Sequence, residues 1–209
     1  MDVTIPVDVF DVIIIGGGPG GLTAGLYASR AGMKTLLLEG NVTVSQITVT
    51  DIVENYPGVP NISGPELIMK FREHALSFGM GMKQEQAHSI ESEHIGDISG
   101  WKVQTDVGTY RTLAVIVSTG AVWRKLGIPG ELEFAGRGVS YCATCDGPFY
   151  RNSEVIVVGG GDTAVQEALF LTKFASKVTI VHRRDRLRAT AILQKRAFAH
   201  DRIEFVWDS

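Results

Sequence analysis

Two stretches of the chain repeat one pattern of apolar and polar positions. In the first, the mostly apolar segment 9–15 runs into the glycine-rich segment 16–21, and a helical stretch from Leu22 to Ala31 follows. A long apolar run is typical of a strand that is buried on both faces of a parallel sheet. With a further apolar strand at 34–38, this stretch predicts a β-α-β unit.

The second stretch begins with the apolar segment 154–158, which leads into Gly159 and a helix expected to end near Phe174. A strand at 177–181 completes the unit, and the segment 202–207 is expected to form a third strand. The duplication predicts an α/β fold with two Rossmann-like, three-layer dinucleotide-binding domains, of which the second is incomplete.

The region between these units predicts one helix and several strands. A loop rich in proline and glycine at 56–60 precedes a helix expected from about Pro65 to Phe78. Strands are expected near 81–90, 100–105, 109–111 and 114–118. We place the domain boundary within 119–123, which predicts a first domain at 1–122 and a second at 123–209.

Composition and charge narrow the classes of function. The net charge of −3 gives the molecule no attraction for nucleic acid or for an anionic membrane. No apolar run reaches the roughly 20 residues of a membrane span, and residues 1–6 lack the features of a secretion signal. Two neighbouring cysteines do not make a secreted disulfide framework, so we expect a cytoplasmic protein.

The first glycine-rich segment carries a nucleotide-binding fingerprint. Gly16, Gly18 and Gly21 follow the GxGxxG spacing, with Gly20 beside them, between a predicted strand and a predicted helix. Glycines there allow a tight turn and a close approach of the backbone to a pyrophosphate, which the helix N-terminus holds. Glu39 ends the next strand, where an acid can accept hydrogen bonds from a ribose. The alternative is a glycine turn needed only for packing.

The second fingerprint has the same spacing but a different charge at the end of the following strand. It consists of Gly159, Gly161 and Ala164, together with Asp162, expected to cap the helix, and Thr163. In place of an acid, the next strand ends in His182, Arg183 and Arg184, followed by Arg188. Guanidinium groups match a 2′-phosphate, so the second site is expected to prefer NADPH to NADH. The alternative for the arginines is a solvated face or a nucleic-acid patch.

The chain has only two cysteines, Cys142 and Cys145, and they lie between the two fingerprints. A zinc site would need further ligands, and the five histidines lack metal-ligand spacing, so no metal is expected. Inert structural thiols would not need the Cys-x-x-Cys spacing, whereas a redox pair would. Asp146 adjoins the pair and could move protons during exchange, although it could also serve as a helix cap. The arrangement suggests electron flow from nicotinamide to flavin, to the disulfide, and to an external partner.

Several motifs together resemble low-molecular-weight thioredoxin reductase. They are the CATCDG segment 142–147, the GGGDTA segment 159–164, HRR at 182–184, GGGPG at 16–20, ENYPG at 54–58 and STG at 118–120. The resemblance implies an FAD domain, an NADPH domain with the dithiol, a homodimer, and a domain rotation that alternately presents nicotinamide and cysteines to the flavin. It also implies that Cys145 faces the flavin, that Cys142 attacks the thioredoxin disulfide and that Asp146 donates a proton. Gln46 and Asn55 match positions that contact FAD.

The sequence departs from the family pattern in two respects. Val44 and Ser45 stand where the family usually has two glycines, and side chains there could crowd the flavin beside Gln46. Family members also continue beyond the position of Ser209, so we expect an unfinished NADPH sheet and a flavin site that lacks one wall. Three hypotheses follow: an NADPH-dependent thioredoxin reductase, a truncated fragment without activity and with impaired FAD binding, and a reductase for another dithiol protein such as a peroxidase partner.

Overall fold

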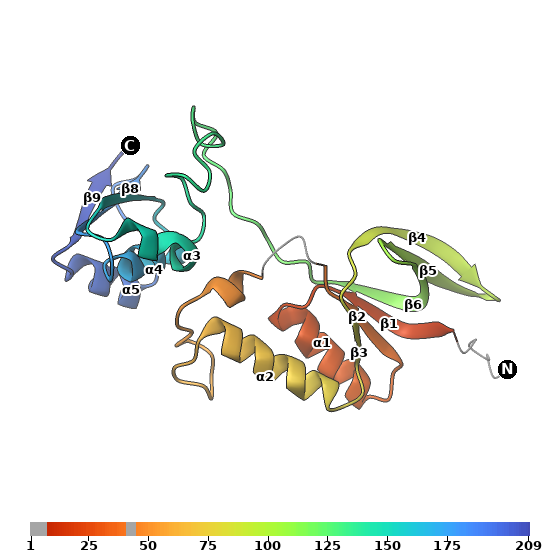
Figure 1. Cartoon of the computed structure of the whole chain (residues 1–209). Helices are drawn as coiled ribbons and strands as arrows, with labels where there is room; N and C mark the ends of the chain where they lie inside the picture. The colour runs from red at the N-terminus through yellow and green to blue at the C-terminus, as the bar shows by residue number, and fades with distance from the viewer. Residues whose placement is uncertain (1–7, 41–44) are drawn as a thin grey trace. The chain divides into compact units, whose positions relative to one another are not determined.

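The computed structural model describes residues 8–40 and 45–209. The chain divides into two compact units, Met1–Val122 and Trp123–Ser209 (Figure 1). Each unit is an α/β structure with its own sheet and its own buried apolar core. None of the helices in the described part of the chain is long and apolar enough to cross a membrane.

The first unit contains a mixed sheet with strand order β3-β2-β1-β6-β5-β4. Its strands are β1 (Val9–Ile15), β2 (Thr35–Leu38), β3 (Gly81–Lys83), β4 (Ala87–Ile95), β5 (Ile98–Thr105) and β6 (Thr109–Val117). Strands β3, β2, β1 and β6 are parallel neighbours, whereas β4, β5 and β6 form an antiparallel meander. In the register, Ile14 of β1 lies between Leu37 of β2 and Ile116 of β6.

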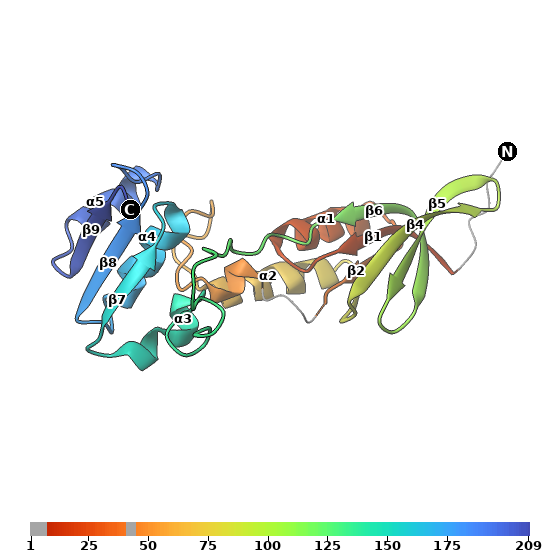
Figure 2. The same ribbon diagram turned by 90° about the horizontal axis from the view of Figure 1, so that it is seen from above.

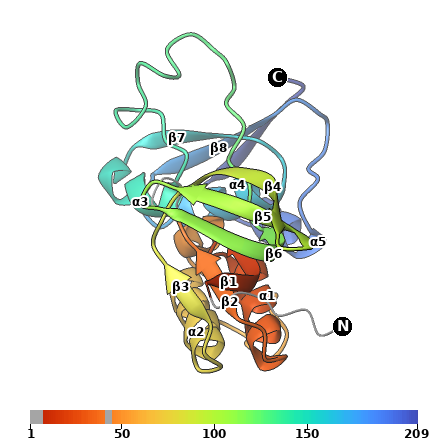
Figure 3. The same cartoon turned by 90° about the vertical axis from the view of Figure 1, so that its right-hand side faces the viewer.

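The first unit has three layers, which Figure 3 shows from one end. Helices α1 (Pro19–Arg30) and α2 (Gly64–Leu76) pack on one face of the parallel strands, where Leu22 and Leu37 are fully buried. On the other face the meander folds back over β1 and β2, and Val103 of β5 is fully buried there. The apolar character of β1 and β2 follows from this arrangement, because both of their faces are covered.

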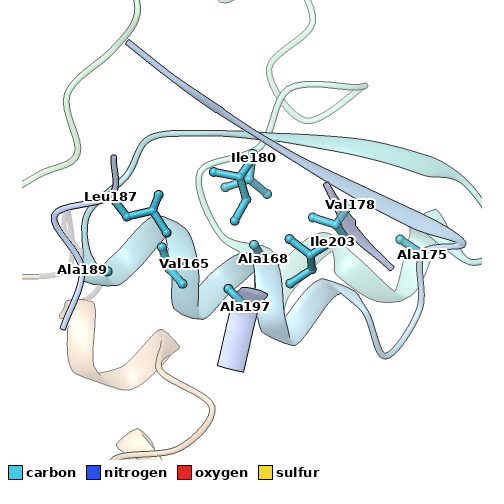
Figure 4. Packing of buried hydrophobic residues seen from close by; sticks show 10 residues of the cluster. Val165, Ala168, Ala175, Val178, Ile180, Leu187, Ala189, Ala197 and Ile203 are labelled. Atoms are coloured by element: carbon cyan, nitrogen blue, oxygen red, sulfur yellow. The ribbon is translucent and has the colours of Figure 1, made fainter. Parts of the chain in front are cut away.

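The second unit contains a parallel sheet with strand order β7-β8-β9. Its elements are the short helix α3 (Ala143–Asp146), β7 (Glu154–Val158), α4 (Asp162–Leu171), β8 (Lys177–His182), α5 (Ala191–Phe198) and β9 (Ile203–Trp207). Figure 2 shows α4 and α5 beside this sheet. Figure 4 shows the core between them, with Val165 and Ala168 of α4 directed toward Ile180 of β8 and Ile203 of β9.

Only one face of the second sheet is buried in the described residues. Val157 and Ile180 belong to the core cluster, whereas Ile156, the neighbour of Val157 on β7, has 69% of its surface exposed. Side chains alternate between the two faces of a strand, so this contrast marks the covered and uncovered faces. In the described residues, this unit therefore has two layers: the sheet, and the helices α4 and α5 on one of its faces (Figure 2).

Three of the expected strands, those at 81–90, 109–111 and 114–118, differ from the strands of the structure. The single strand expected at 81–90 is two strands, because the chain leaves β3 at Lys83 and turns before β4. Glu85 lies in this turn with its carboxylate buried, and accepts hydrogen bonds from Thr105 and Tyr110 at 2.7 and 2.8 Å. The strands expected at 109–111 and 114–118 are one strand, because β6 pairs with β1 along both parts.

Helix α5 was not predicted at all. Its only fully buried side chain is that of Ala197, and Phe198 and Ile192 are both at least half exposed. Without a strong apolar stripe, the helical period is hard to detect in the sequence.

The helix expected to end near Phe174 is α4, which ends at Leu171.

A pair of isoleucine substitutions tests which face of the second sheet carries the core. Ile180→Ala removes a fully buried side chain and should lower the free energy of unfolding by about 2–5 kcal/mol. Ile156→Ala, its matched control on the exposed face, should change it by no more than about 0.5 kcal/mol. Urea unfolding followed by circular dichroism measures both, and equal losses in the two variants would contradict this assignment of faces.

Candidate functional site

The first glycine-rich turn packs directly against neighbouring backbone at the carboxyl ends of β1 and β6. Gly16 has φ +116°, and a Cβ there would collide with the carbonyl group of Ser118. A Cβ at Gly21 would collide with the carbonyl oxygen of Gly16, where α1 begins. These two positions therefore require glycine. Because neither residue has a Cβ atom, the backbone of the turn can pack directly against the neighbouring backbone.

Ser118 holds this turn in place through hydrogen bonds. The sequence pattern alone did not predict this role. Its hydroxyl lies 3.1 Å from the carbonyl oxygen of Ile15 and 3.2 Å from that of Gly16. Its backbone N–H also donates to Ile15 at 2.8 Å. The available signals were its position at the end of the strand expected at 114–118 and its place in the STG segment 118–120.

The start of α1 is open to a ligand. Gly18 is the N-cap residue, Pro19 follows it, and no side chain of the described residues caps the helix. Gly20 is exposed in the first turn, where a Cβ would only touch Ser118. The first N–H groups of a helix need acceptors, so this end is suited to a pyrophosphate.

Glu39 lies beside this turn, as predicted for a ribose-binding acid. A Cβ at Gly17 would collide with the Glu39 carboxylate, so the two residues are in close contact. The same carboxylate forms an ion pair with Arg72 of α2 at 2.7 Å, and the Glu39 side chain is about three-quarters buried. Sequence reasoning missed Arg72, because no motif links it to the end of β2.

The two other residues predicted to contact FAD lie in loops of the first unit. Gln46 begins the 3₁₀ helix η1 (Gln46–Val49), and its side-chain amide donates to the carbonyl oxygen of Ala121 at 2.7 Å. Asn55 is exposed in the loop after Val53. Of the pair that replaces the family's two glycines, Val44 lies outside the described residues. Ser45 is the N-cap residue of η1, near Gly18.

The second glycine-rich turn repeats this arrangement in the second unit. Gly159 has φ +142°, and a Cβ at Gly160 would collide with the ring of His182 at the end of β8. Gly161 is the N-cap residue of α4, again without a side-chain cap from the described residues. The carbonyl oxygen of Gly160 accepts hydrogen bonds from the N–H groups of Arg188 and Ala189 at 2.6 and 3.0 Å. The arginine-rich loop is thereby held against the turn.

Asp162 does not cap α4 as predicted. It is the first residue of the helix, and its carboxylate accepts a hydrogen bond from the N–H of Thr190 at 2.6 Å. Thr190 is the N-cap residue of α5, so Asp162 joins the starts of two helices. Thr163 is exposed in the first turn of α4.

His182 and the arginines differ in their surroundings. Arg183, Arg184 and Arg188 are exposed and form no ion pair with any described residue. His182 is only 6% exposed, and its Nε2 has no hydrogen-bond partner in the described part of the chain. Burial lowers the pKa of His182, and the nearby arginines lower it further, so the neutral ring is favoured.

The two cysteines form a disulfide at α3, with their Cα atoms 5.3 Å apart. Cys142 is the half-buried N-cap residue, and its sulfur accepts a hydrogen bond from the N–H of Cys145 at 3.2 Å. Cys145 is exposed. Asp146 is half-buried, and its N–H donates to the carbonyl oxygen of Cys142 at 3.1 Å. The disulfide and the neighbouring acid, Asp146, therefore lie together on one helical turn.

A buried carboxylate organises the segment before the dithiol. Glu131 accepts hydrogen bonds from the N–H groups of Leu126 and Gly127 at 2.9 and 2.6 Å, and from the hydroxyl of Tyr141 at 2.7 Å. These hydrogen bonds lower the pKa of Glu131 despite its burial. The ring of Tyr141 stacks on Trp123. This cluster fixes the residue directly before Cys142 and was not predicted.

Residues 10–209 match the family model for pyridine nucleotide-disulphide oxidoreductases. The chain belongs to this family. Thioredoxin reductases of Bacillus subtilis and Listeria monocytogenes are 50% and 51% identical to it, over 96% of this chain and 62% of each relative. The chain thus spans about 62% of the length of these curated relatives.

Two solved structures of thioredoxin reductases are also similar to this chain. The thioredoxin reductase of Lactococcus lactis has a TM-score of 0.90 at 51% identity, covering 95% of this chain and 64% of that one. The enzyme of T. acidophilum has a TM-score of 0.87 at 30% identity, covering 96% and 64%. These findings confirm the predicted fold class and the resemblance to thioredoxin reductase.

Proposed function

We propose that the protein takes part in the NADPH-dependent, FAD-assisted reduction of a protein disulfide through Cys142 and Cys145. The observation that carries this proposal is the disulfide on an accessible helical turn, in a chain that also has two glycine-rich nucleotide turns. The relatives named thioredoxin reductase support a thioredoxin, or a similar dithiol protein, as the partner.

Several features of the first unit support FAD as its proposed cofactor. Gly16, Gly18, Gly20 and Gly21 form a turn with an open helix start, and Glu39 beside the turn can accept hydrogen bonds from ribose hydroxyls. Arg72 holds that carboxylate in place. Gln46 and Asn55 are further proposed contacts. FAD, when bound, supplies two-electron transfer between reduced nicotinamide and a disulfide.

Several features of the second unit support NADPH as its proposed ligand. Gly159 and Gly161 leave the start of α4 open, with Asp162 and Thr163 in its first turn. The 2′-phosphate is proposed to bind the guanidinium groups of Arg183, Arg184 and Arg188, which lack acidic partners among the described residues. The orphaned Nε2 of His182 supports a polar ligand near Gly160.

The proposed reduction of the partner's disulfide consists of two thiol–disulfide exchanges. After two electrons have reduced the pair, the Cys142 thiolate attacks one sulfur of the partner's disulfide, forms a mixed disulfide and releases one partner thiolate. The Cys145 thiolate then attacks the Cys142 sulfur, restores the internal disulfide and releases the second partner thiolate. The two released thiolates take up two protons, which balance the two that Cys142 and Cys145 lose on forming their thiolates. Asp146 is the proposed donor and regains its proton between the two exchanges. The resemblance also supports a homodimer in the cytoplasm.

Serine substitutions test the two cysteine roles. The wild-type protein, with FAD, NADPH and thioredoxin, should consume NADPH in proportion to the thioredoxin reduced. Cys142→Ser and Cys145→Ser should each lose this activity, because one sulfur cannot complete both exchanges. Absorbance at 340 nm measures the rate, and thioredoxin reduction that persists in either variant would contradict the proposal.

The same variants separate the attacking sulfur from the resolving sulfur. Cys145→Ser should retain an attacking thiol and form a stable mixed disulfide with a thioredoxin whose active-site sulfur carries a thionitrobenzoate group. Cys142→Ser should form little of this product, and non-reducing gel electrophoresis followed by mass spectrometry measures both. A mixed disulfide found only with Cys142→Ser would reverse the two roles.

Alanine substitutions in the arginine-rich loop test the proposed preference for NADPH. Replacing Arg183 and Arg184 together by alanine should raise the KM for NADPH about tenfold or more, because charge-assisted hydrogen bonds contribute about 1.5–3 kcal/mol each. The KM for NADH should stay unchanged, since NADH has no 2′-phosphate. Arg186→Ala is the matched control, because Arg186 is exposed in the same loop and has no assigned contact. Equal effects on both nucleotides would refute a phosphate-binding role.

A further inference from the structure

The hydroxyl group of Thr144 lies beside one sulfur of the disulfide. Its oxygen is 3.3 Å from the Cys142 sulfur, and both residues are half-buried. A disulfide sulfur carries no proton, so the hydroxyl is the only possible donor between these two atoms. Thr144 belongs to the CATCDG segment, but neither the sequence analysis nor the proposed reaction gave it a role.

The two sulfurs of the disulfide differ in their hydrogen bonds. The Cys142 sulfur has two donors within reach, the Thr144 hydroxyl at 3.3 Å and the N–H of Cys145 at 3.2 Å. The Cys145 sulfur accepts no hydrogen bond from the residues that the structure describes. Hydrogen bonds from neighbouring donors stabilise a negative charge on sulfur. The turn is therefore better suited to a thiolate at Cys142 than to one at Cys145.

The elements packed against α3 offer acidic groups rather than cations. Arg151, which follows the 3₁₀ helix η2 (Gly147–Tyr150), lies over the ring of Phe174, 5.2 Å from its centroid. None of the titratable groups on α3, η2 and α4 is cationic, so on these elements only hydrogen-bond donors can stabilise a thiolate at Cys142. These groups are Asp146 on α3, Tyr150 on η2, and Asp162 and Glu167 on α4, with Tyr141 directly before Cys142.

We propose that Thr144 is a catalytic residue whose hydroxyl donates a hydrogen bond to the Cys142 sulfur and stabilises the Cys142 thiolate. The inference rests on the redox role proposed above for Cys142. A hydrogen bond to an ionised acceptor is stronger than one to a neutral acceptor, so the contact gains strength when the disulfide is reduced and Cys142 ionises. The thiolate is the attacking species, so the hydroxyl increases the fraction of protein that can attack.

The hydroxyl keeps its proton throughout the exchange. As the Cys142 thiolate attacks, its sulfur bonds to one partner sulfur, the partner's disulfide bond breaks, and the second partner sulfur leaves with the electron pair. A stabilised thiolate is more abundant but less nucleophilic, by about threefold for each tenfold gain in ionisation. The gain exceeds the loss below the midpoint of ionisation, and only the loss remains well above it.

The substitution Thr144→Val tests the hydroxyl, because valine has the shape of threonine but no donor. The reference protein and all variants carry Cys145→Ser, which keeps the backbone N–H at position 145 and leaves Cys142 as the only thiol. The rate of exchange with dithiodipyridine, a small disulfide, is measured against pH by the absorbance of the released thiopyridone.

In Thr144→Val the midpoint of this pH profile should rise by about one unit, because a hydrogen bond to the ionised sulfur is lost. The exchange rate should fall about threefold below the midpoint and rise about threefold on the alkaline plateau. A substitution that only loosened the turn would not change the rate in opposite directions at the two ends of the profile.

Two further substitutions serve as controls. Thr144→Ser restores a hydroxyl and should return the midpoint to that of the reference protein. Ser140→Ala removes a hydroxyl that lies 3.1 Å from the backbone nitrogen and 3.2 Å from the carbonyl oxygen of Cys142, so it should leave the midpoint in place. An unchanged or lower midpoint in Thr144→Val, or no recovery in Thr144→Ser, would overturn the proposal.

Circular dichroism shows whether each variant folds, and Thr144→Ala replaces Thr144→Val if the valine variant does not. The exchange assay uses no NADPH, FAD or thioredoxin. A shifted profile, together with a wild-type protein that lacks NADPH-dependent turnover, would therefore refute only the proposed function. Turnover by the wild-type protein with an unshifted profile would refute only the role of Thr144.

Discussion

The close approach of a glycine-rich turn to the end of the next parallel strand is the constraint on which both units depend. In the first unit, the second glycine of the turn, Gly17, contacts the Glu39 carboxylate. In the second unit, the equivalent Gly160 contacts the His182 ring. Any side chain on these glycines would displace the residue at the end of the neighbouring strand, so the turn and the strand end form one structure.

The same geometry with different charges fits the two nucleotide sites proposed above. Glu39 is negative and is paired with Arg72, which suits hydrogen bonding to a ribose. His182 is buried and favoured in its neutral form, and the exposed arginines next to it suit a phosphate. Hydrogen bonds from the arginine loop to Gly160 keep this positive charge close to the start of α4. We therefore propose that one framework supports two recognition chemistries.

The sequence predicted the parts of this structure that depend on local pattern. The apolar runs of β1 and β7 and the glycine spacing led directly to both turns, and the Cys142–Cys145 spacing led to the disulfide. Contacts between segments far apart in the sequence, such as Glu39 with Arg72, were not predictable, because no periodicity encodes them. The cap expected at Asp162 failed for the same reason, since its partner Thr190 lies in a distant loop. Helix α5 was missed because it buries too few apolar side chains.

The proposed function requires that electrons from NADPH reach the Cys142–Cys145 disulfide. The most direct measurement is the intact mass of the protein after anaerobic incubation with FAD and NADPH, followed by alkylation with iodoacetamide. Transfer to the disulfide predicts the addition of two carbamidomethyl groups, one for each cysteine, and none when NADPH is left out. A flavin that loses its colour on addition of NADPH while the protein mass stays unalkylated would contradict the claim.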